Sequence, residues 1–153
     1  MSAADRLKEL GIALPSPPAP VASYVPYTFS GDQVFISGQI PLKDGKPQFI
    51  GKVGDGISLE EAQAAAKLCG VNVLAQLSAA CDGNLDRVVR CLKLGVFVNA
   101  VPDYTQQPEV ANGASDLMVA VFGDAGKHAR AAVGVGSLPR GVAVEVEAVF
   151  EIS

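Results

Sequence analysis

The chain has 153 residues, a length typical of one ordinary domain. Apolar residues make up 49% of it and charged residues only 18%, a composition that excludes a disordered chain and supplies ample material for a hydrophobic core. The net charge of -4 argues against a general nucleic-acid binder and against a protein that binds anionic membranes.

The N-terminal segment is predicted to begin with a short helix over residues 2–11, which Ser2 can cap and Gly11 can end. It lacks the apolar stretch of a secretory signal, and the sequence holds no run of about 18 apolar residues that could cross a bilayer. We therefore expect a cytoplasmic protein without a membrane partner.

A proline-rich segment follows this helix. Residues 13–24 contain four prolines, which exclude a helix or a central strand and indicate an extended surface segment. We accordingly divide the chain into an N-terminal extension, residues 1–20, and one domain, residues 21–153. Because the prolines keep the extension out of a sheet interior, we expect it to be dispensable for folding.

The first part of the domain alternates between apolar and polar residues. Residues 27–30 and 33–41 are separated by Gly31-Asp32, a pattern that predicts a hairpin. Further along, Ser58 and Glu61 have the spacing of a capping box, which predicts a long helix that ends near Cys81.

The second half of the domain predicts a further strand, helix and strand pair. Residues 87–98 and 128–135 are predicted strands, and a helix between them begins near Pro108 and ends near Gly123. Residues 142–152 form the last strand. The resulting order of two strands, helix, strand, helix and two strands predicts an α+β fold, in which two helices cover one face of a mixed sheet.

Three cysteines and one histidine limit the metal chemistry that the chain can perform. Cys69, Cys81 and Cys91 are odd in number and show no CxxC spacing, which argues against a disulfide framework and a zinc site. We interpret them as core residues in a reducing compartment, and we expect no metal site.

The last predicted strand has one wholly apolar face, while the other face carries Glu145 and Glu147. Arg130, on the preceding strand, is surrounded by alanine and glycine, so that its planar guanidinium has room for a carboxylate ligand. If these two strands pair through the turn at 138–141, Arg130 and the two glutamates share a face. A simple cross-strand salt bridge on a solvated face remains the alternative.

Several segments resemble the RidA (YjgF, reactive intermediate deaminase A) family. They are ISGQIP (residues 36–41) with Tyr24 thirteen residues before Ser37, the block ARAAVGVGSLPRGVAVEVEA (residues 129–148), and Asn112 in the second helix. The chain has alanine where many members have a cysteine, at Ala132. It is therefore identified as a divergent member.

The resemblance implies a chorismate-mutase-like fold and a homotrimer with ligand clefts between subunits. It further implies cofactor-free hydrolysis of reactive 2-enamino and 2-imino acids to 2-oxo acids and ammonia. Arg130 matches the carboxylate-binding arginine and Glu145 the glutamate that activates water. Tyr24, Ser37 and Asn112 match residues that line the cleft.

Two alternatives remain at this point. The same trimer could bind a small carboxylate without turning it over, because the cysteine is missing. The family is also labelled endoribonuclease L-PSP, but the net charge of -4 and the absence of a histidine pair argue against a nucleic-acid partner. His128 shares the face of Arg130, as a substrate contact or as a loop residue at the start of the strand.

Overall fold

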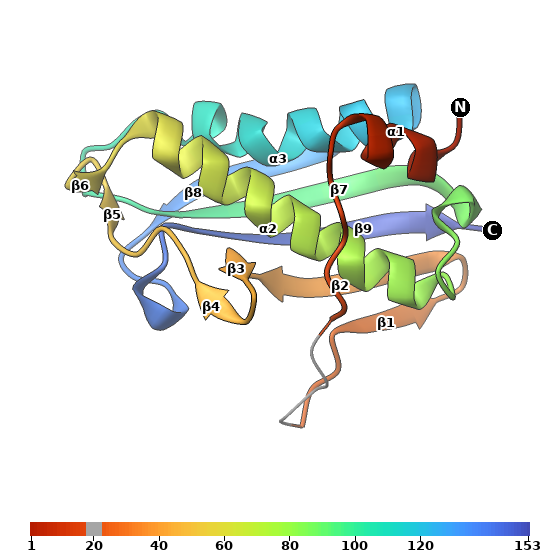
Figure 1. The fold of residues 1–153 in the computed structure, drawn as a ribbon. Coiled ribbons are helices and arrows are strands. Elements are labelled where there is room, and N and C mark those ends of the chain that lie inside the picture. Colours follow the sequence, from red (N-terminus) through yellow and green to blue (C-terminus); the bar gives the residue numbers. More distant parts are fainter. Residues whose placement is uncertain (18–22) are drawn as a thin grey trace.

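The computed structural model describes residues 1–17 and 23–153, and its centre is a mixed five-stranded sheet (Figure 1). The strands run in the order β1-β2-β9-β7-β8. Their bounds are β1 Tyr27–Ser30, β2 Gln33–Gln39, β7 Val88–Asn99, β8 Ala129–Val135 and β9 Val144–Ile152. Four two-residue strands form small ribbons beside it: β3 Leu42–Lys43, β4 Lys46–Pro47, β5 Lys52–Val53 and β6 Gly56–Ile57.

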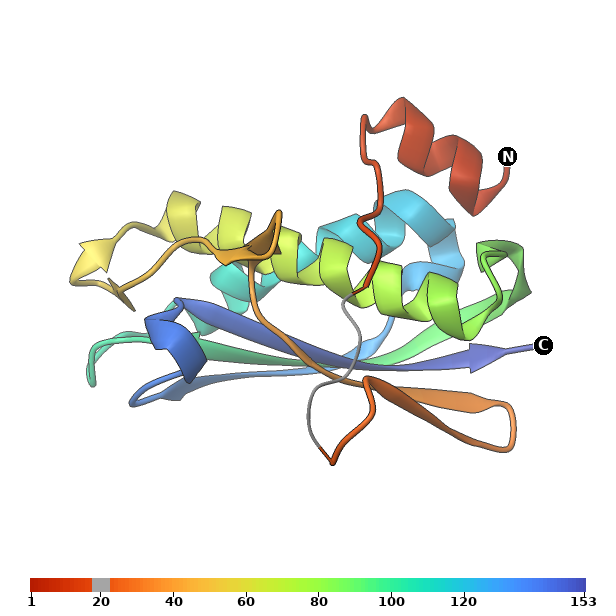
Figure 2. The same cartoon turned by 60° about the horizontal axis from the view of Figure 1, so that its bottom comes forward.

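Helices α2 (Leu59–Ala80) and α3 (Gln107–Phe122) lie together on one face of this sheet (Figure 2). Within residues 1–17 and 23–153, the opposite face carries no helix. Short 3-10 turns connect elements at Leu85–Arg87, Gly123–Gly126 and Pro139–Gly141. The predicted α+β fold with two helices on one face of a mixed sheet is thereby confirmed. None of the helices in the part of the chain described is long and apolar enough to cross a membrane.

The predicted helix boundaries are confirmed by the capping contacts. Ser58 Oγ accepts the Glu61 backbone N–H at 3.1 Å, and the Glu61 carboxylate accepts the Ser58 N–H at the same distance. Helix α3 has Pro108 in its first turn and ends at Gly123, whose φ of +64° is readily adopted by glycine. These are local signals, which explains why they are readable in the sequence.

The hydrophobic core lies between the helices and the covered face of the sheet. The apolar face predicted for the last strand is buried there in full: Val142, Val144, Val146, Ala148, Phe150 and Ile152. All three cysteines are buried with free thiols. Burial raises the pKa of Cys91 to about 12 and that of Cys69 well above its ordinary value, so both sulfurs are neutral core groups.

The predicted N-terminal helix is confirmed as α1 (Ala3–Glu9), capped by Ser2. It packs against α3: Ala3 and Leu7 are buried, and Arg6 Nη1 donates to the Val121 carbonyl at 3.2 Å. These contacts change our expectation that the extension is dispensable, since its removal would expose apolar core surface. The part of the predicted proline-rich segment at residues 18–22 lies outside the described residues.

The predicted pairing of the last two long strands is wrong. β8 pairs in parallel with β7, and β9 pairs antiparallel with the other edge of β7. The physical reason is the connection: α3 carries the chain from β7 to β8 as a crossover, which returns a strand parallel to its predecessor. Strand β7 therefore separates Arg130 from Glu145.

This arrangement also places Arg130 and Glu145 on opposite faces. In register, Arg130 lies beside Leu94, a buried residue that faces the helices. Glu145 lies beside Phe97 and Glu147 beside Gly95, the alternate positions of β7, which face away from the helices. The common face that the sequence interpretation assumed does not exist within one chain.

Candidate functional site

Arg130 lies on β8 with its guanidinium turned toward α3. One nitrogen, Nη1, donates to Asn112 Oδ1 at 2.8 Å and to Ser115 Oγ at 3.1 Å. Among residues 1–17 and 23–153, Nε and Nη2 have no hydrogen-bond partner. These two nitrogens form one edge of the planar fork, and that edge matches the two oxygens of a carboxylate. The exposed Arg130 is therefore held at one end and open to a ligand at the other.

Secondary structure explains how the partners of Arg130 meet. Asn112 and Ser115 are three residues apart on α3, so both project from the same side of the helix. The crossover from β7 through α3 to β8 then brings this side of the helix beside β8. Two of the predicted site residues, Arg130 and Asn112, are thus brought together by the fold.

The other three predicted residues gather in a different place. A hollow of about 730 Å³ is lined by Tyr24, Ser37 and Glu145. It lies at the end of β2 beside the β3–β4 ribbon and the turn before β9. Ser37 Oγ donates to the Pro26 carbonyl at 3.1 Å and thereby ties β2 to the segment that carries the exposed Tyr24.

An irregularity in the sheet lies along the wall of this hollow. The ladder between β2 and β9 shifts register between Ile36 and Gln39, within the ISGQIP motif. A Cβ built on Gly38 would lie 2.9 Å from Glu145 Cδ, so only glycine leaves room for the carboxyl group over this strand. The glycine of the motif therefore allows Glu145 to lie along the wall of the hollow.

The environment of Glu145 changes its acidity. Burial raises the pKa of its carboxyl above the ordinary value, and the nearby carboxylate of Glu147 raises it further. A carboxyl group with a raised pKa can exchange a proton closer to neutral pH, which suits general acid–base work.

Two residues of this hollow were missed by the sequence analysis. Arg140 lies in the turn before β9 in a left-handed conformation, with φ +59°, and adds a cation to the lining. Gln76 of α2 is only 4% exposed, and its Oε1 has no hydrogen-bond partner among the described residues. The position of Gln76 between the core residues Ala75 and Leu77 was a signal in the sequence that this polar side chain is buried. No pattern in the sequence pointed to Arg140.

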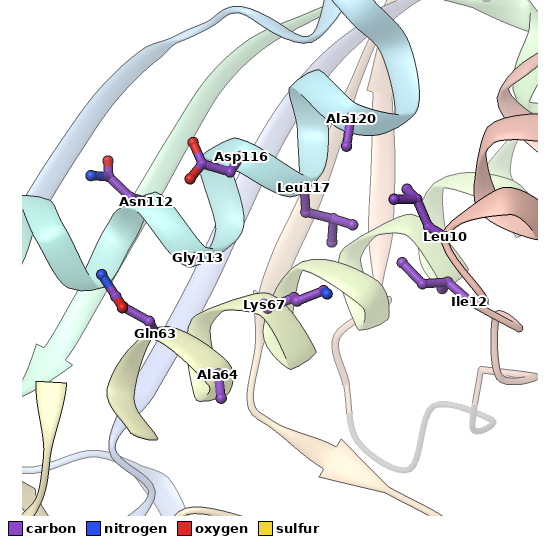
Figure 3. A pocket seen from close by; sticks show the side chains of 10 residues that line it. All are labelled: Leu10, Ile12, Gln63, Ala64, Lys67, Asn112, Gly113, Asp116, Leu117 and Ala120. Carbon is purple, nitrogen blue, oxygen red and sulfur yellow. The ribbon is translucent and has the colours of Figure 1, made fainter. Parts of the chain in front are cut away.

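A separate pocket of about 390 Å³ lies on the outer side of the helix layer (Figure 3). Leu10 and Ile12 of the N-terminal segment face Leu117 across it, and Lys67 and Asn112 lie on its α2 and α3 sides. It shares Asn112 with the predicted site, but Arg130 is not among its lining residues. In the described part of the chain, no group of three or more His, Cys, Asp or Glu side chains is arranged to hold a metal ion.

Comparison with known proteins places this chain among relatives of the same fold. Protein TCP17 of Trypanosoma cruzi is 50% identical over 98% of this chain and 94% of its own length. The crystal structure of Atu1372 of Agrobacterium tumefaciens, described as of unknown function, is 47% identical with a TM-score of 0.93, over 99% of this chain and 92% of that one.

A more distant structural relative is RidA of the Antarctic bacterium Psychrobacter sp. PAMC 21119, at 28% identity and a TM-score of 0.59, over 90% of this chain and 94% of that one. The difference between these TM-scores agrees with a divergent subgroup. The family model that matches is described as YjgF/chorismate mutase-like, putative endoribonuclease, and it covers residues 4–147. The chain therefore belongs to the YjgF/chorismate mutase-like family, to which the RidA proteins are related.

Proposed function

We propose that this protein is a homotrimeric hydrolase that converts reactive 2-enamino and 2-imino acids to 2-oxo acids and ammonia, in clefts between subunits. The residues of the proposed site are Arg130 and Asn112 from one subunit and Tyr24, Ser37 and Glu145 from the next. A reducing compartment such as the cytoplasm fits the three free thiols of the chain. The family relationship to RidA supports a role in small-molecule processing.

One observation supports the proposal: a single chain carries an arginine suited to bind a carboxylate and a glutamate suited to acid–base work, on opposite faces of its sheet. Arg130 offers a free edge for a carboxylate, and Glu145 lines a hollow large enough for a small acid. A second copy supplies the missing half where β8 and α3 of one subunit meet the hollow of another. The helix-free face also exposes Phe35 and Val133, apolar surface that further copies would cover.

The chemistry follows from these two groups. The Nε/Nη2 edge of Arg130 binds the substrate carboxylate and fixes the position of the adjacent imine carbon, which is the electrophile. Glu145 takes a proton from a water molecule while the oxygen of that water molecule bonds to the imine carbon. The same carboxyl then returns this proton to the nitrogen, which gives a carbinolamine. Glu145 next accepts the proton of the new hydroxyl group and passes it to the nitrogen as the carbon–nitrogen bond breaks, so that the hydroxyl oxygen becomes the carbonyl oxygen of the 2-oxo acid and ammonia leaves.

Proton exchange is the step for which the environment of Glu145 is suited. A carboxylate with an ordinary pKa holds a proton weakly near neutral pH and returns it rarely. Because burial and Glu147 raise the pKa of Glu145, the group can act as the base in the first step and as the acid in the second.

The test generates a 2-imino acid with an amino-acid oxidase and follows its disappearance. We expect Arg130→Ala and Arg130→Lys to remain folded and to lose most of the rate acceleration of imine hydrolysis over buffer alone. Lysine keeps the positive charge of arginine but lacks its planar fork. Glu145→Gln should lower turnover with a smaller effect on carboxylate binding. Wild-type activity that survives Arg130→Ala would overturn the proposed site.

The same assay distinguishes the proposed hydrolase from the alternative, a trimer that binds a small carboxylate without turning it over. In that case, the wild-type protein binds a simple carboxylate such as benzoate in an Arg130-dependent manner, but it does not accelerate hydrolysis of any imino acid offered.

A further inference from the structure

His128 is the only histidine of the chain, and its two ring nitrogens have different partners. Nδ1 lies 2.6 Å from the Gly126 carbonyl oxygen, and Nε2 lies 2.9 Å from Ser115 Oγ. A carbonyl oxygen can only accept a hydrogen bond, so Nδ1 carries the hydrogen. In the neutral ring, Nε2 is then an acceptor, and the hydrogen between the two side chains belongs to Ser115.

This tautomer determines what Ser115 presents to Arg130. Because its hydroxyl hydrogen points to His128, Ser115 Oγ turns its lone pairs toward Arg130 Nη1, which donates to it at 3.1 Å. The second Nη1 hydrogen is donated to Asn112 Oδ1 at 2.8 Å. Both hydrogens of Nη1 are therefore used, and the orientation of the guanidinium plane is defined.

We propose that His128, acting through Ser115, is a positioning residue that holds the Nε/Nη2 edge of Arg130 ready for a substrate carboxylate. This inference rests on the proposed function, in which Arg130 binds that carboxylate. An exposed arginine without such anchors loses rotamer freedom when it binds, and this loss weakens affinity. The hydrogen bonds that link Gly126, His128, Ser115 and Arg130 fix the guanidinium of Arg130 before the ligand binds.

The first measurement is benzoate binding by titration calorimetry. We expect His128→Ala and Ser115→Ala to weaken binding about ten-fold each, equivalent to about 1.4 kcal/mol. The double variant should lose little more than either single variant, because both residues act along one path. Ser115→Thr keeps a hydroxyl and should restore most of the affinity that Ser115→Ala loses. Lys127→Ala, beside His128 but outside these contacts, is the matched control.

The second measurement is nitrogen NMR of the single histidine, which needs no assignment. We expect the neutral ring to carry its hydrogen on Nδ1, and the Nε2 resonance to shift in Ser115→Ala. In the imine assay, the variants should raise KM by about the factor seen for benzoate and change kcat little, as expected when ground-state and transition-state binding are lost equally. A role limited to folding would not produce this combination.

Different outcomes overturn the inference and the proposed function. If Arg130→Ala loses benzoate while His128→Ala binds it like the wild type, or if the hydrogen resides on Nε2, the positioning role of His128 is wrong and the carboxylate site stands. If the benzoate and NMR results are as expected but the wild type hydrolyses no imino acid, the positioning role stands and the catalytic proposal is wrong.

Discussion

Arg130 and Glu145 lie on opposite faces of one sheet, separated by strand β7. Arg130 is beside Leu94 on the covered face, and Glu145 is beside Phe97 on the helix-free face. Neither side chain can reach a ligand held by the other within one subunit. Under the proposed function, the reaction therefore depends on contacts between chains.

This relationship predicts complementation between two inactive variants. Arg130→Ala and Glu145→Gln should each be poorly active alone, and refolding them as a mixture should restore imine hydrolysis. In a mixed ring, some cleft combines the native Arg130 of one subunit with the native Glu145 of the next. The measurement compares the mixture refolded together with the same proteins refolded separately and then combined. Equal, low activity in both preparations would contradict a shared cleft.

The helix-free face predicts the assembly. We expect light scattering to give a mass three times the 15.7 kDa of one chain. Val133 is 45% exposed on β8, so Val133→Glu should place a charge in the subunit contact and release monomers. Ala64→Glu, on the exposed side of α2, is the control and should keep the assembly. A wild-type monomer at micromolar concentration would contradict the prediction.

The raised pKa of Glu145 predicts the acid side of the pH profile. Glu145 works as a base in its carboxylate form, so kcat/KM falls as pH drops through the pKa of this group. Because burial and Glu147 both raise that pKa above the ordinary 4.5, the fall should begin at a higher pH than for an unperturbed glutamate. Glu147→Gln removes the like charge and should move the fall to lower pH.

Glu151→Gln serves as the control for this experiment. Glu151 is on the same strand but does not contribute to the raised pKa of Glu145, so the fall in kcat/KM should stay where it is in the wild type. Identical profiles for the wild type and Glu147→Gln would contradict the electrostatic explanation.

The packing of α1 predicts a loss of stability when its buried leucine is truncated. Leu7 is 6% exposed, and Leu7→Ala should lower the free energy of unfolding in urea by about 2–3 kcal/mol. Leu10 is 44% exposed, and Leu10→Ala should cost less than about 1 kcal/mol. Equal effects of the two substitutions would show that α1 does not pack on α3 in solution.

The amino-acid sequence by itself determined the elements and their inner faces. The capping box of α2, the hairpin at Gly31-Asp32 and the apolar face of β9 depend on residues close together in the chain. Such local rules act before any long-range contact forms, so they can be read in sequence. The resemblance to the family identified the candidate residues, but it did not show how they are placed in space.

Only the tertiary structure decided which strands are neighbours and which faces coincide. The alternation of side chains along a strand shows that Arg130 and Ala131 point to opposite faces of the sheet. It does not show which of the two shares a face with Glu145, because this depends on how β8 and β9 each pair with β7, and α3 separates β7 from β8 in the sequence. The joining of Arg130 to Ser115 and His128, and the place of Gln76 in the hollow, depend likewise on packing between distant elements. These contacts form only when the sheet and helices pack together, so no local pattern in the sequence encodes them.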